Sequence, residues 1–240
     1  TDGQVLTSAG AGAAAAWETV AGGLTGKVEG TNFTDSLLVG HSTTGTLNAA
    51  QDNTGVGIDA LDALTSGDNN TAVGSGAGTA ITTGTTNVAI GASALMTNST
   101  GNTNTAVGYS ALQDATGTGN VGVGYDAGDN VSSGNYNTCV GRDSGQNITT
   151  GSGNIIIGYV DAAANDSART LKITSYDGTT TTNHIIGDSS GNLTFPADVT
   201  LGDDLLLDSD SCVLKFGDDQ DVTLTHTDGT GLTLNSTSKL

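Results

Sequence analysis

The stretch that decides the fold reads NTGVG at residues 53–57 and returns as NTAVG at 70–74, NVAIG at 87–91, NTAVG at 104–108, NVGVG at 120–124, NTCVG at 137–141 and NIIIG at 154–158. Successive copies of this motif begin 17 residues apart, with one interval of 16. A weaker copy, SLLVG, occupies residues 36–40. A fixed period of this kind is typical of repeat architectures, in which each repeat stacks on its neighbours.

Each interval from one motif to the next, called a coil below, contains a second glycine after its motif glycine. These second glycines are Gly67, Gly84, Gly101, Gly117, Gly134 and Gly151. The segments between glycines are too short for helices, so we expect two short strands and two turns in each coil. The pattern predicts an all-β protein with a parallel β-solenoid (a β-roll) of 17-residue coils, stacked about 4.8 Å apart.

The first motif position is always asparagine. Asparagine tolerates left-handed turns, and amides stacked along a solenoid can bond to one another. We therefore expect a structural ladder rather than a ligand site. Its members are Asn53, Asn70, Asn87, Asn104, Asn120, Asn137 and Asn154.

The remaining motif positions divide by strand alternation. Position 4 is always Val or Ile, and position 2 is Thr, Val or Ile, so these two positions are expected to form the apolar core stripe. Position 3 points the other way and is mostly small, as in Ala89 and Ala106. Because a strand uncharged on both faces is usually covered on both, we expect position 3 to pack against another copy of the chain, in a parallel homotrimer.

Composition narrows the function classes. The 240 residues include 37 glycines, one proline and nine aromatic residues, which is few large residues for a globular core. The formal net charge of −19 argues against nucleic acid or an anionic membrane as partner. No stretch is long and apolar enough for membrane insertion.

The sequence gives no sign of catalysis, metal binding or a cofactor. His41, His184 and His226 are far apart and share no motif, and the acid pairs near residues 203 and 218 read as solvated turns. Solenoid enzymes that cleave polysaccharides need grouped carboxylates, which the coils lack. Cys139 replaces a small residue and is expected to be a buried free thiol, without a disulfide to Cys212.

Three regions follow from the change of pattern. Residues 1–30 form an N-terminal connecting segment, in which Trp17 is expected to anchor a chain interface. Residues 31–160 form the solenoid. Residues 161–240 lose the period and alternate in short strands with Asp- and Gly-rich separators, which predicts an interleaved short-strand fibre region that continues beyond Leu240.

The motif sequences also carry a family resemblance. NTAVGYSAL at residues 104–112 resembles repeats in tail-fibre and other virion-fibre proteins of marine bacteriophages, as do the opening DGQVLTS and the late run from Leu201 to His226. NVAIG at residues 87–91 is similar to the head repeats of trimeric autotransporter adhesins, which form a trimeric β-roll. The resemblance implies a homotrimeric virion fibre for host attachment, in contact with other virion proteins. The alternative is a bacterial cell-surface adhesin of trimeric autotransporter type.

One column of side chains is the candidate binding surface for a host glycan or protein. The position after the motif glycine varies, and its last four occupants are Tyr109, Tyr125, Arg142 and Tyr159. Stacked coils should align them into one exposed strip, called the tyrosine column below. Tyrosine rings beside a guanidinium can receive a sugar face or a polar chain. In the alternative interpretation the rings only cover alanines and stiffen the coils.

Overall fold

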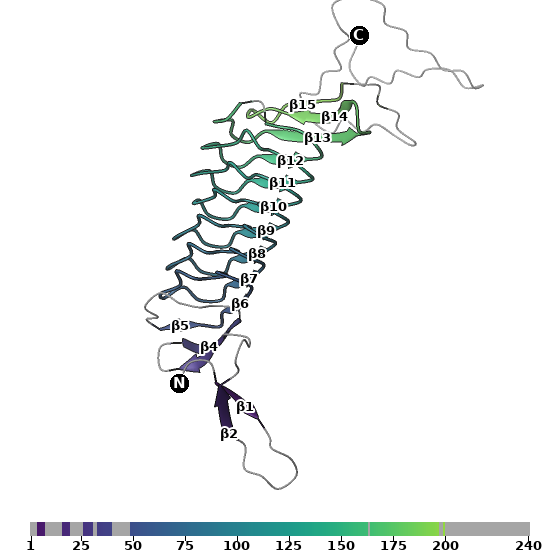
Figure 1. Cartoon of the computed structure of the whole chain (residues 1–240). Coiled ribbons are helices and arrows are strands. Elements are labelled where there is room, and N and C mark those ends of the chain that lie inside the picture. The colour runs from purple at the N-terminus through teal and green to yellow at the C-terminus, as the bar shows by residue number, and fades with distance from the viewer. Residues whose placement is uncertain are drawn as a thin grey trace, which may run out of the picture. The chain divides into compact units, whose positions relative to one another are not determined.

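The computed structural model describes residues 4–7, 16–19, 26–30, 33–39, 49–162, 164–196 and 199, with side chains from residue 38 onward. All regular structure in these residues is β, and none of it is helical. Residues 1–198 make up one compact unit. Figure 1 shows its short strands stacked one above another.

The elements follow the chain in order. The first five strands are β1 (Gln4–Thr7), β2 (Ala16–Thr19), β3 (Gly26–Gly30), β4 (Phe33–Val39) and β5 (Ala50–Gln51). The motif strands are β6 (Thr54–Val56), β7 (Thr71–Val73), β8 (Val88–Ile90), β9 (Thr105–Val107), β10 (Val121–Val123), β11 (Thr138–Val140) and β12 (Ile155–Ile157). The last three are β13 (Leu171–Tyr176), β14 (Thr181–Gly187) and β15 (Leu193–Thr194).

The motif strands form one continuous parallel sheet, so the predicted β-solenoid is confirmed. Each pairs with the next in strict register, as Val88 does with Thr105 and Thr105 with Val121. The weak copy at residues 36–40 contributes β4, whose Leu37 pairs with Thr54. The stack also continues past residue 160, because β13 pairs in parallel with β12.

Each coil contains one three-residue strand, and not the two strands expected from its length. The far side of the coil consists of turns, which still bond to the next coil. Leu61 N donates to Ala77 O over 3.1 Å, and Gly78 N donates to Ala94 O over 2.9 Å. The turns therefore satisfy their backbone groups without extended geometry, as buried backbone must.

A ladder of buried asparagines runs along the motif strands. The Asn87 side-chain amide donates to Asn70 Oδ1 over 3.1 Å and to Gly101 O over 2.9 Å, and Asn70 Oδ1 also accepts from Asn87 N. Equivalent bonds link each asparagine from Asn53 to Asn154. The 16-residue coil preserves the ladder, since Asn104 Nδ2 bonds to Gly117 O over 2.9 Å. Each amide thus joins its own coil to the coil before it.

The expectation for the two strand faces was wrong. Motif position 3 points into the coil's own core, where Gly55, Ala72, Ala89, Ala106, Gly122, Cys139 and Ile156 are all buried. Positions 2 and 4 point outward, and Ile90 is 40% exposed. The small residues therefore do not form a contact with another copy of the chain.

Core volume explains the reversal. The turn side supplies the large buried side chains, among them Leu61, Leu95 and Leu112. A Cβ added at Gly122 would lie 2.7 Å from Leu112 Cγ, so position 3 has room only for small residues opposite a leucine. Where the turn side offers only Ala162, position 3 is Ile156, which restores the volume.

Antiparallel strands flank the parallel stack at both ends. β3 pairs with β4, while β14 and β15 follow β13 in the same sheet. The short strands expected near residues 170–174, 184–187 and 192–195 correspond to these last three elements. β1 and β2 form a separate antiparallel pair.

Cys139 is free and buried as predicted, and burial raises the pKa of its thiol to about 12. The expectations for the Trp17 side chain, His41, Cys212, His226 and the late acid pairs lie outside the described residues.

Candidate functional site

The tyrosine column is positioned by backbone hydrogen bonds. Beside the motif glycines, Asp126 N donates to Tyr109 O over 2.9 Å, and Asp143 N donates to Tyr125 O over 2.8 Å. These bonds hold the residues after each motif glycine directly above one another. A stack of coils in strict register therefore brings together side chains that lie about 17 residues apart in sequence.

The rings in the column stack on each other. The ring centroids of Tyr109 and Tyr125 are 5.2 Å apart with 14° between the ring planes, and the Arg142 guanidinium carbon lies 5.6 Å from the Tyr125 centroid. Tyr159 stacks instead with Tyr176 of β13, at 4.5 Å and 21°. The sequence predicted the alignment, but the rings offer each other their faces and leave mainly edges and hydroxyls to solvent.

Carboxylates flank the column and set its electrostatics. The Arg142 Nε lies 3.0 Å from the Asp143 carboxylate, so the cation of the column is already paired. The negative charge of Asp126 is the main cause that raises the pKa of the Tyr125 phenol. Desolvation, with the Asp143 charge second, raises the pKa of Asp126 itself. The column thus offers aromatic surface within a negative environment.

Asp129, on the turn side of the same coil as Tyr125, predicts how stability depends on pH. Partial burial, and then the charge of Asp126, raises its pKa to about 6. An acid whose pKa is raised by folding destabilises the native state once it ionises, so stability should fall as pH rises from about 4 to about 6. Urea unfolding at several pH values should show this loss. Asp129→Asn should reduce it, whereas the exposed Asp166→Asn should not; equal pH slopes in all three proteins would contradict the assignment.

Two aromatic residues near this region were not singled out from the sequence. Tyr176 lies beyond the last motif, where the period is lost, so only the structure shows its stacking with Tyr159. Tyr136 is 69% exposed and has a φ of 57°, the left-handed region that a bulky residue rarely adopts. A signal was present, because Tyr136 directly precedes a motif asparagine at a position held elsewhere by Asn, Thr or Gly.

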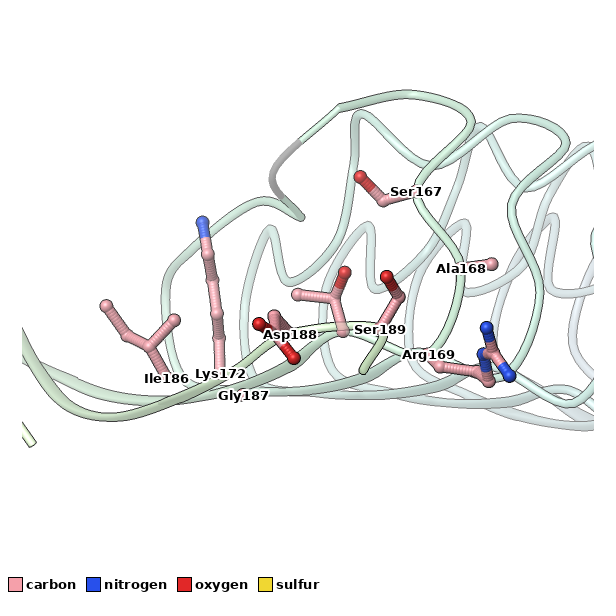
Figure 2. A pocket seen from close by; sticks show the side chains of 9 residues that line it. Ser167, Ala168, Arg169, Lys172, Ile186, Gly187, Asp188 and Ser189 are labelled. Atoms are coloured by element: carbon pink, nitrogen blue, oxygen red, sulfur yellow. The ribbon is translucent and has the colours of Figure 1, made fainter. Parts of the chain in front are cut away.

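A shallow hollow of about 450 Å³ lies where β13 and β14 meet the preceding turn. Its lining includes Arg169, Lys172, Asp188 and Ser189. Figure 2 shows that the Lys172 and Arg169 side chains point in different directions and do not converge on one point. Lys172 Nζ already donates to Asp161 O over 2.7 Å, and Asp188 accepts hydrogen bonds from Ser190 N and from Asn192. The hollow therefore lacks the convergent charges of an anion site.

In the part of the chain that the structure describes, no group of three or more His, Cys, Asp or Glu side chains is arranged to hold a metal ion. The same residues include no helix long and apolar enough to cross a bilayer. Comparison of the chain with protein-family models, with curated proteins and with solved structures found no match. The argument for function therefore rests on the surfaces of the solenoid.

Proposed function

We propose that this chain is a structural subunit of an extracellular virion fibre, assembled as a parallel homotrimer, and that its coils carry a host-attachment surface. One observation carries the proposal: the outer face of the motif sheet is apolar and uncovered. This outer face is defined by motif positions 2 and 4. Its members are Thr54, Val56, Thr71, Val73, Val88, Ile90, Thr105, Val107, Val121, Val123, Thr138, Val140, Ile155 and Ile157.

The composition of the outer face supports burial against a partner. It contains no charged residue over seven strands, although the chain as a whole carries 25 acids. Ile155 is 44% exposed and Ile90 is 40% exposed in the single chain. Parallel sheets are almost always covered on both faces, and contiguous exposed apolar surface marks interaction sites. The outer face, rather than the small residues of position 3, is therefore the proposed contact between copies.

A second copy of the same chain is the partner that fits the outer face best. Its rows of β-branched side chains repeat once per coil, with a spacing of about 4.8 Å. Another copy aligned in parallel presents the same rows at the same spacing, so side chains can interdigitate along the whole stack. Closed cyclic symmetry then limits growth and leaves an elongated assembly, which suits a fibre. The resemblance to trimeric fibre repeats favours three copies.

The test of assembly compares a charge on the outer face with a charge in the coil core. Ile90→Glu should abolish assembly, because a trimer would bury an unpaired carboxylate, yet the single chain should keep its β circular dichroism. Sedimentation should give about 71 kDa for the wild type, three times the chain mass of 23.6 kDa, and one chain mass for the variant. Ala106→Glu should instead unfold the coil, since Ala106 is fully buried within it.

Thr100→Glu provides the matched control, because Thr100 is exposed at the corner remote from β8. It should keep both the trimer mass and the spectrum. A wild-type mass of one or two chains, or a trimer that survives Ile90→Glu, would contradict the proposed assembly.

A further inference from the structure

The tyrosine column ends at Tyr109 on the side of the earlier coils. The same backbone ladder continues there, since Ser110 N donates to Ala92 O and Ser93 N donates to Ser75 O, both over 2.9 Å. The next two side chains in line with the ring are therefore the methyl group of Ala92 and the hydroxymethyl group of Ser75. Neither can cover an aromatic ring in the way that Tyr125 covers the other face of Tyr109.

The ring faces of the column are thus unequal. Tyr125 lies between the Tyr109 ring and the Arg142 guanidinium, so both of its faces are engaged. Tyr109 has one engaged face, and its side chain is 52% exposed. The free face of Tyr109, bordered by Ala92 and Ser75, is called the Tyr109 shelf below. A flat ring placed on this shelf would continue the stack by one step.

Charge restricts what can bind on the Tyr109 shelf. The guanidinium of Arg142 is paired with Asp143, and the acids Asp126 and Asp59 lie at the position after the column in their own coils. The chain carries a net charge of −19 in addition. A carboxylated or sulfated ligand would meet like charge without a free cation to compensate. The shelf therefore fits an uncharged ring that has an apolar face and a polar rim.

We propose that the Tyr109 shelf binds an uncharged β-linked hexopyranose through the C–H face of its ring. An all-equatorial pyranose has a flat apolar face that can cover the tyrosine ring and exclude water, while its hydroxyl groups remain solvated at the rim. Ser75 provides a hydroxyl beside the ring. This inference rests on the proposed attachment function and specifies its ligand class, and it moves the contact from the whole column to its open end.

The experiment uses the full chain with ¹³C-labelled tyrosine rings, titrated with cellotetraose, with chitotetraose and with the anionic tetragalacturonate. The Tyr109 signal is assigned by its absence from the spectrum of Tyr109→Ser. At least one neutral tetrasaccharide should shift the Tyr109 signal most among the five tyrosines, and tetragalacturonate should shift none. Tyr109→Ser should weaken binding at least tenfold, measured by calorimetry.

Tyr136→Ser is the matched control, because Tyr136 is the more exposed ring and lies outside the column. It should leave the Kd for the neutral tetrasaccharide unchanged. Sedimentation of the same samples separates this inference from the proposed assembly. A trimer whose Tyr109 signal responds to neither neutral sugar overturns the inference and leaves the fibre proposal standing. Loss of the trimer in Tyr109→Ser also overturns it, since the shelf would then contact another copy.

Discussion

Gly74→Ala should cost the solenoid roughly 2–6 kcal/mol of its free energy of unfolding, from two separate effects. The φ of Gly74 is 134°, a backbone region that is essentially restricted to glycine. A Cβ at Gly74 would also lie 2.6 Å from the carbonyl carbon and oxygen of Gly91 in the next coil. That neighbour is backbone and cannot rotate away, so two coils would have to move apart.

The measurement is urea unfolding followed by circular dichroism, with Gly76→Ala as the matched control. Gly76 also has a positive φ, of 69°, but a Cβ there would meet only Thr79 Oγ1 at 3.4 Å. The control should therefore cost about 1–2 kcal/mol, the ordinary cost of a left-handed alanine. If both variants lose the same stability, contact between the coils is not what requires glycine at the end of the motif.

Asn104→Ala should cost a similar amount, because it removes the central amide of the asparagine ladder. Asn104 Oδ1 accepts from Asn120 N over 2.8 Å, and Asn104 Nδ2 donates to Gly117 O over 2.9 Å. Alanine would leave both buried groups without these partners. Each unpaired buried group costs about 1–3 kcal/mol, so we expect a loss of roughly 2–6 kcal/mol. Loss of the bond from Asn104 Nδ2 to Asn87 Oδ1, at 3.2 Å, adds to this.

Asn130→Ala tests whether burial is the reason. Asn130 also reaches the next coil, where its Nδ2 donates to Gln146 O over 2.9 Å, but its side chain is exposed and water can replace the bond. The same unfolding experiment should give a loss of less than about 1 kcal/mol for this variant. An Asn104→Ala protein as stable as Asn130→Ala would mean that the ladder is not a source of stability.

The asparagine ladder and the tyrosine column illustrate why so much could be predicted from the sequence. In a stack with a fixed period, residues at equal motif positions in adjacent coils must be neighbours in space. Register is then set by sequence spacing alone, and the alignment of Tyr109, Tyr125 and Arg142 needs no knowledge of long-range folding. The stacking of Tyr159 on Tyr176 was not predictable in this way, because the period is lost after Gly158.

The sequence by itself determined the coil, its parallel stacking and the columns that run along it, because these depend only on the period. Only the tertiary structure decided which strand face is inside. Alternation separates position 3 from positions 2 and 4, yet it does not say which set the coil encloses. The enclosed space is narrow, since Leu95 and Leu112 from the turn side fill it, and only residues such as Ala89 and Ala106 fit opposite them. The larger valines and isoleucines are therefore left outside, where they form the surface that another copy can cover.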